Sequence, residues 1–301
     1  METPLREKYG KYFTLMKKLS RAAEKIDETK VYEPANPDTR KIMYSMLEEN
    51  LLPGSRLEGI ENFKAFYDAV KSGQHGLILM EHYSNMDLPA IVYLLEKYGE
   101  DWARDLSSRI VAIAGMKLNE ANPMVRAWAE GFTRVVIYPT RSLDKVENQE
   151  NLSTKAKEEE EKRARKINLA AMRVMDQCKH RGEVILVFPS GTRFRPGHPE
   201  TKKGLREIDS YLRMFNKMIL VSINGCCLRI NPADTEDMLS DLVAQDKVIM
   251  TASPVLDCKQ FRKNILTNLP QDDPDPKQKV IDHVMDILNA QHDEIEKTRF
   301  N

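Results

Sequence analysis

The sequence lacks any long hydrophobic run. An apolar stretch such as residues 90–95 is far shorter than the ~20 residues that a helix needs to cross a bilayer. We therefore expect no transmembrane helix. The first residues, 1–7, also lack the apolar core of a secretory signal peptide. Together these absences favour a cytoplasmic protein that is soluble or peripherally associated with a membrane.

Cysteine is scarce, and its spacing does not match that of metal ligands. The four cysteines are Cys178, Cys226, Cys227 and Cys258. Cys226 and Cys227 are adjacent on an expected strand, so their side chains should point to opposite faces. We interpret all four as reduced thiols and expect neither a disulfide nor a metal site.

An excess of charge of one sign is also missing. The 46 lysines and arginines equal the 46 aspartates and glutamates. A neutral balance provides no overall attraction to nucleic acid or to anionic lipid. We expect no nucleic-acid partner, and any basic site must be local.

Residues 1–74 are expected to form a small N-terminal helical domain without a convincing strand. Apolar residues recur at helical spacing in three stretches, 12–19, 42–47 and 63–70. The expected domain either shapes a binding groove or covers one edge of a sheet, and the sequence leaves both readings open.

Strands and helices alternate in the rest of the chain, residues 75–301. The expected strands are 77–80, 109–114, 134–138, 184–188, 218–223 and 248–252. The expected helices between them are 88–98, 123–130, 167–179 and 204–215. This alternation predicts an α/β fold with a mostly parallel, mixed sheet that helices cover on both faces.

Two further segments stand apart from this alternation. Residues 144–166 form a charged insertion with acid–base pairs four apart, which indicates a solvated helix or a mobile loop; contact with lipid headgroups is the alternative. The stretch 276–299 has apolar residues on one helical face, and Asp275 is the expected cap of that helix.

A histidine and an aspartate frame the turn between the first strand of the α/β region and the helix after it. His82 follows the strand 77–80, and Asp87 stands where the helix begins. An imidazole can accept a proton from an alcohol, and a carboxylate can orient it and stabilise the cation that forms. Asp87 also suits the N-cap of the helix, so two roles compete for its oxygens.

Arginines follow two later strands. Arg193 and Arg195 leave the strand 184–188 through a Pro- and Gly-rich turn, and their planar donors match a phosphate. Backbone N–H groups of this turn can add anion contacts; the residues concerned are Ser190, Gly191 and Thr192. Arg141, after the strand 134–138, is a further candidate for the anion site, and surface ion pairing of these arginines is the alternative.

Three blocks of this sequence resemble the glycerolipid acyltransferase superfamily. Residues 82–87 (HYSNMD) match its H-x-x-x-x-D block, residues 131–141 resemble its glycine–strand–basic block, and residues 188–193 (FPSGTR) match its F-P-E-G-T-R block. Ser190 replaces the glutamate of the third block. This serine and the following R-x-R-P are similar to the soluble, plastid-type glycerol-3-phosphate acyltransferases.

The resemblance implies a glycerol-3-phosphate 1-O-acyltransferase without a cofactor. It assigns His82 as the general base and Asp87 as its partner, with Arg193, Arg195 and Arg141 at the substrate phosphate. The implied partners are glycerol 3-phosphate and an acyl donor, acyl-CoA or acyl carrier protein. The location would be the cytoplasm, or the plastid stroma after processing. A lysophosphatidate acyltransferase and a non-catalytic module that binds a phosphorylated ligand or an acyl carrier are the alternatives.

Overall fold

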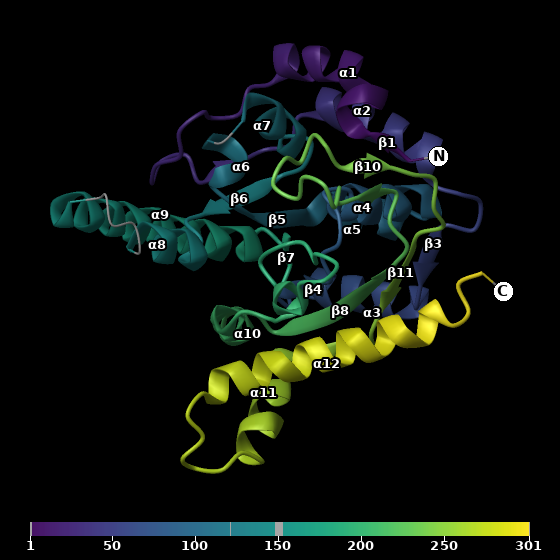
Figure 1. The fold of residues 1–301 in the computed structure, drawn as a ribbon. Helices are drawn as coiled ribbons and strands as arrows, with labels where there is room; N and C mark the ends of the chain where they lie inside the picture. Colours follow the sequence, from purple (N-terminus) through teal and green to yellow (C-terminus); the bar gives the residue numbers. More distant parts are fainter. Residues whose placement is uncertain (1, 121, 148–152, 301) are drawn as a thin grey trace. The chain divides into compact units, whose positions relative to one another are not determined.

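The computed structural model describes residues 2–120, 122–147 and 153–300 (Figure 1). The chain forms two compact units. The first contains Met1–Tyr9, Tyr44–Ile110 and Gly182–Asn301, and the second contains Gly10–Met43 and Val111–Arg181. Helices α1 (Leu5–Leu19) and α2 (Pro37–Asn50) give residues to both. These units therefore divide the chain differently from the expected domains 1–74 and 75–301.

The first unit is built on a mixed sheet. Its strand order is β7 (Val184–Val187), β4 (Gly76–Met80), β8 (Lys217–Asn224), β11 (Ile249–Ala252) and β3 (Arg56–Glu58), with β12 (Leu256–Asp257) also paired to β8. Strand β4 runs parallel to β7 and β8, whereas β11 runs antiparallel to β8. Every residue of β4 and β7 is buried, as is typical of parallel strands covered on both faces.

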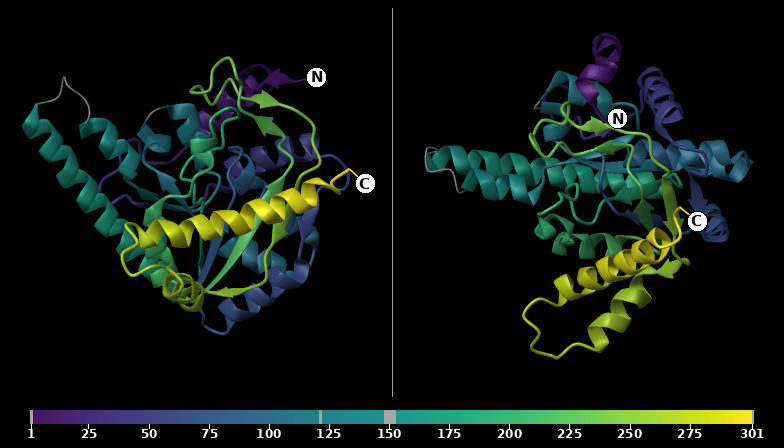
Figure 2. Two further views of the ribbon diagram at one scale, coloured as in Figure 1. Left: turned by 60° about the horizontal axis from the view of Figure 1, so that its bottom comes forward. Right: turned by 45° about the vertical axis from the view of Figure 1, so that its right-hand side comes forward.

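Helices α3 (Ile60–Lys71) and α12 (Pro276–Glu296) cover opposite faces of this sheet, as the two views agree (Figures 1 and 2). Ser222 of β8 accepts a hydrogen bond from Gln291 of α12. On the other face, a Cβ added to Gly76 of β4 would meet Phe66 of α3 at 2.8 Å. The expected α/β fold is therefore confirmed for this unit.

The second unit contains its own strands. Strand β5 (Ile110–Gly115) pairs in parallel with β6 (Arg134–Ile137), and β2 (Tyr32–Glu33) pairs antiparallel with β6. Arg134 forms a buried ion pair with Glu33. A carboxylate of its own sheet therefore neutralises this arginine.

The remaining helices complete the two units. They are α4 (Asp87–Tyr98), α5 (Asp101–Arg109), α6 (Lys117–Glu120), α7 (Pro123–Ala129), α8 (Thr140–Glu147), α9 (Thr154–His180), α10 (Asp209–Met214) and α11 (Cys258–Thr267), besides the 3-10 helices Pro199–Lys202 and Arg206–Ile208. A small sheet joins β1 (Thr3–Pro4), β10 (Leu242–Val243) and β9 (Leu228–Arg229). None of the helices in the described ranges is long and apolar enough to span a membrane.

All six predicted strands are confirmed, but some local expectations are wrong. Residues 1–74 do contain short strands, and β3 pairs in parallel with β11; three residues are too few to show a period of two. The helix expected at 204–215 is shorter, because Gly204 packs directly against Ile281 and Met285. Cys226 and Cys227 lie beyond the end of β8, because Gly225 turns the chain with φ +89°.

The charged insertion is largely helical. Residues 154–166 form the first part of α9, and residues 144–147 end α8. The positions 148–152 lie outside the described residues. Asp275 caps α12 as expected, since its carboxylate accepts the N–H of Gln278.

Candidate active site

The turn between β4 and α4 brings His82 and Asp87 into contact. Oδ2 of Asp87 lies 3.0 Å from Nδ1 of His82. The same oxygen accepts the backbone N–H groups of Tyr83 at 2.7 Å and Ser84 at 2.8 Å. Asp87 is buried, so these donors replace the water that would otherwise solvate its charge.

The competing role of Asp87 as a helix cap is not realised. Met86 occupies the N-cap position of α4, and Asp87 is the first helical residue. Its carboxylate therefore points back to the turn that carries His82 instead of forward to the helix. The hydroxyl of Ser84 accepts the N–H of Met86 at 3.0 Å, which stabilises the turn in this conformation.

The imidazole of His82 is held by contacts on two sides. Because a carboxylate only accepts hydrogen bonds, Nδ1 carries the proton that bonds Asp87. The ring of Phe188 stacks on the imidazole with centroids 3.8 Å apart and planes 14° apart. Among the described residues, none hydrogen-bonds Nε2, and 16% of the side chain is exposed. The lone pair of Nε2 is therefore placed to accept a proton from a bound hydroxyl.

The loop after β7 lies beside this turn. The N–H of Phe194 donates to the carbonyl of His82 at 2.7 Å. Gly191 has φ +64°, and an added Cβ would meet Leu205 at 2.4 Å, so only glycine fits this bend. The N–H of Gly191 already donates to Phe188, and the Ser190 hydroxyl donates to the Thr192 carbonyl. Of the three expected anion contacts, the N–H of Gly191 is thus engaged within the turn.

Arg193 and Arg195 both form ion pairs. Arg193 is buried and pairs with the fully buried Asp241. Nδ2 of Asn85 lies 3.5 Å from the same Asp241 oxygen, so the guanidinium lies next to the His82 turn. Burial raises the pKa of Asp241 to about 6, although the charge of Arg193 acts in the opposite direction. Arg195 pairs with the exposed Glu236 at 2.7 Å.

The structure therefore gathers His82, Asp87, Arg193 and Arg195 within the first unit. Arg141 belongs to the second unit, where it is the exposed second residue of α8.

Sequence reasoning missed a second histidine–carboxylate pair next to His82. Nδ1 of His292, on α12, lies 3.0 Å from Oε2 of the buried Glu81. The hydroxyl of Tyr83 donates to the other oxygen of Glu81 at 2.9 Å. Burial, reinforced by the charge of Glu81, raises the pKa of Tyr83 above its ordinary value. An acidic residue directly after a fully apolar strand was the signal that could have identified Glu81.

The thiol of Cys226 also lies near the His82–Asp87 pair, but it is not activated as a nucleophile. Burial raises the pKa of Cys226 to about 12, and the charge of Asp87 contributes to this rise. The group therefore stays a thiol near neutral pH, whereas a nucleophilic cysteine needs a lowered pKa. Among the described residues there is also no cluster of His, Cys, Asp and Glu side chains arranged to hold a metal ion.

Comparison with known proteins gives one family. The family model described as Acyltransferase matches residues 55–217, which include β4, the His82 turn, β7 and the arginine loop. No curated protein is found to match the chain.

Proposed function

Because the chain belongs to the acyltransferase family, we propose that it transfers a fatty acyl group from acyl-CoA or acyl-ACP to the sn-1 hydroxyl of glycerol 3-phosphate. The product is lysophosphatidate. The observation that carries this proposal is the contact of His82 with Asp87 through Nδ1, while Nε2 of the imidazole has no hydrogen-bond partner among the residues that the structure describes.

The chemistry follows from this contact. Nε2 of His82 takes the proton of the sn-1 hydroxyl as the oxygen attacks the thioester carbonyl carbon. The C–S bond then breaks, and the imidazolium returns its proton to the leaving thiolate. Asp87 stabilises the positive charge that His82 carries between these two proton transfers.

Direct transfer needs no acyl-enzyme. Cys226 has a raised pKa and is therefore a poor nucleophile. In a complex that holds donor and acceptor together, correct orientation supplies a large part of the rate. The stacking of Phe188 on His82 contributes by fixing the plane of the imidazole.

The arginine loop supports a phosphorylated acceptor. Arg193 and Arg195 lie in the segment that hydrogen-bonds the His82 carbonyl through Phe194. The ion pair of Arg195 with Glu236 is exposed, and such pairs contribute only about 0–1 kcal/mol. A phosphate can therefore replace Glu236 at little cost. Ser190 and the R-x-R-P sequence at 193–196 support the closer relation to the plastid-type enzymes.

A side-by-side acyl-transfer assay tests the proposal. The purified protein is given one acyl thioester with glycerol 3-phosphate or with lysophosphatidate, and the products are identified by mass spectrometry. We expect lysophosphatidate from glycerol 3-phosphate. We also expect His82→Ala to lower kcat by roughly 10²- to 10⁴-fold, the usual contribution of a general base.

His198→Ala is the matched control. This histidine also contacts a carboxylate, Glu200 at 3.1 Å, but 60% of its side chain is exposed. Its loss should leave kcat unchanged. Turnover only with lysophosphatidate would replace the proposed acceptor. Binding of ligands without turnover would favour a non-catalytic module, and full activity of His82→Ala would overturn the mechanism.

A further inference from the structure

Asp241 connects two motifs of the site from a segment that belongs to neither. It lies directly before β10 and beyond the matched residues 55–217. Its Oδ2 contacts the guanidinium of Arg193 and lies 3.5 Å from Nδ2 of Asn85. Asn85 belongs to the His82 turn, and Arg193 belongs to the loop after β7. One carboxylate oxygen therefore joins both sides of the site.

The carboxylate of Asp241 is costly to bury. The residue has no exposed surface, and its Oδ1 has no hydrogen-bond partner among the described residues. Leaving a buried charged acceptor unsatisfied costs free energy, about 1–3 kcal/mol or more. Such an oxygen is uncommon in folded proteins and calls for an explanation.

The backbone holds Asp241 firmly at this place. Its carbonyl accepts the N–H of Leu5 at 2.7 Å, and the following residues of β10 pair with β1 and β9. The segment is therefore fixed by the N-terminal residues of the chain.

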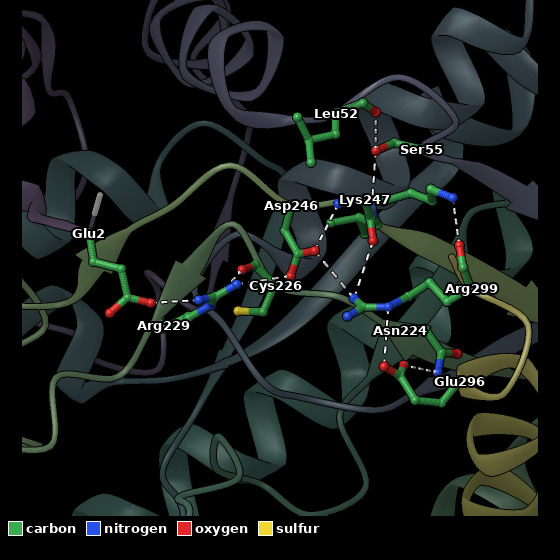
Figure 3. Close-up of polar contacts among 11 residues, drawn as sticks. Glu2, Leu52, Ser55, Asn224, Cys226, Arg229, Asp246, Lys247, Glu296 and Arg299 are labelled. Atoms are coloured by element: carbon green, nitrogen blue, oxygen red, sulfur yellow. Dashed lines mark hydrogen bonds and ion pairs between the residues drawn. The ribbon is translucent and has the colours of Figure 1, made fainter. Parts of the chain in front are cut away.

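A polar cluster around Asp246 anchors the same segment on its other side (Figure 3). Asp246 accepts hydrogen bonds from the N–H of Cys226 at 2.9 Å and from Arg229 at 3.2 Å. Arg299, after α12, lies 3.4 Å from its other oxygen. These contacts anchor both ends of the chain between β8 and β11, the segment that carries Asp241.

We propose that Asp241 is a positioning residue of the acceptor site, which fixes the guanidinium of Arg193 beside the His82 turn so that its remaining N–H groups face the acceptor phosphate. This inference rests on the proposed function. The guanidinium carries five N–H donors in one plane. Asp241 uses one nitrogen, Nη1, and thereby sets the orientation of the others. An arginine held in its binding orientation loses less conformational entropy when the ligand binds.

The test compares Asp241→Ala and Asp241→Asn with the wild type in the acyl-transfer assay. Asp241→Ala should raise the acceptor KM roughly 10- to 100-fold, the size of a lost charged hydrogen bond. The donor KM should not change. Asp241→Asn keeps an oxygen that accepts from Arg193 but loses the charge, so it should raise the acceptor KM less than Asp241→Ala does, by roughly 3- to 10-fold. A residue with a purely structural role would not show this pattern.

A double-mutant cycle with Arg193→Ala identifies the route of the effect. If Asp241 acts through Arg193, adding Asp241→Asn to Arg193→Ala should cause no further rise in the acceptor KM. Asp209→Ala is the control, because Asp209 is equally buried and pairs with Arg262 at 2.6 Å. It should change stability but not the acceptor KM.

Calorimetry measures the affinity for glycerol 3-phosphate without any need for turnover. If the wild type binds glycerol 3-phosphate but does not turn it over, the proposed function is overturned. If Asp241→Asn or Asp241→Ala then weakens this binding, the role of Asp241 is supported. Normal turnover with acceptor KM values within twofold of wild type, or effects fully additive with Arg193→Ala, would overturn the role of Asp241 alone. Absence of both binding and turnover in the wild type would overturn both. If Asp241→Ala does not fold, Asp241→Asn and the double-mutant cycle with Arg193→Ala still test the role of Asp241.

Discussion

Oε2 of Glu81 lies 3.0 Å from Nδ1 of His292, so the residue directly before His82 is bound to the C-terminal helix. Glu81 also accepts the backbone N–H of Ile223 at 2.8 Å. The β4 turn, β8 and α12 therefore meet at one buried carboxylate. Glu81 directly precedes His82 and Asp87 follows it, so the two carboxylates hold the turn at its two ends.

His292→Ala should lower the free energy of unfolding by about 1–3 kcal/mol, because it removes one hydrogen bond to a buried charged group. Glu81 would keep its bonds to Ile223 and Tyr83, so the fold should survive. Urea denaturation measures the change. The exposed His198→Ala should stay within roughly 0.5 kcal/mol of the wild type, and equal shifts in the two variants would contradict the structural role of the pair.

Asp87→Asn should lower kcat by roughly 10²- to 10⁴-fold with little change in the acceptor KM, because the amide cannot stabilise the imidazolium of His82. Steady-state kinetics and a thermal unfolding curve measure both quantities. Asp101→Asn is the matched control, because Asp101 is also the first residue of a helix but its side chain is fully exposed. A kcat within fivefold of wild type would exclude Asp87 from the reaction.

Gly191→Ala should destabilise the protein more than Gly197→Ala does. Both glycines have positive φ, +64° and +82°, but an added Cβ meets Leu205 at 2.4 Å only at position 191. The backbone strain shared by both variants costs about 1–2 kcal/mol. Only Gly191→Ala should also raise the acceptor KM, because it displaces the loop of Arg193. Denaturation and kinetics of both variants check this, and equal effects would argue against a tightly packed turn.

Asp241 should make stability depend on pH in the opposite direction from most carboxylates. Burial raises its pKa from 3.8 to about 6, so between these values the folded protein binds more protons than the unfolded chain. The contribution of Asp241 to the free energy of unfolding is therefore present at low pH and is lost as pH rises through about 6. Asp241→Asn lacks this titration.

Urea unfolding of wild type and Asp241→Asn at stepwise pH values measures the effect. The unfolding free energy of the wild type minus that of the variant should fall as pH rises from 3.8 to about 6, the interval between the unfolded and folded pKa values of Asp241. A difference that rises with pH would mean that the ion pair with Arg193 outweighs the cost of burial.

Short-range features of the site were accessible from the sequence. The run 76–80 is apolar throughout and is a buried strand, because burial on both faces demands it. His82 and Asp87 are five residues apart and meet within one turn, so their contact needs only the local backbone. The shortest strands were not accessible from the sequence. For example, no local pattern indicates that β3 pairs with β11.

Hydrophobic patterning was enough to identify the buried strands and the longer helices, and neighbours within a few residues were enough to identify the His82–Asp87 turn. The carboxylates that contact Arg193 and His292 could be identified only from the folded chain. Asp241 is 48 residues from Arg193, and Glu81 is 211 residues from His292. Such pairs form because the packing of the sheet and its helices brings them together, and buried charges are stable only with a partner.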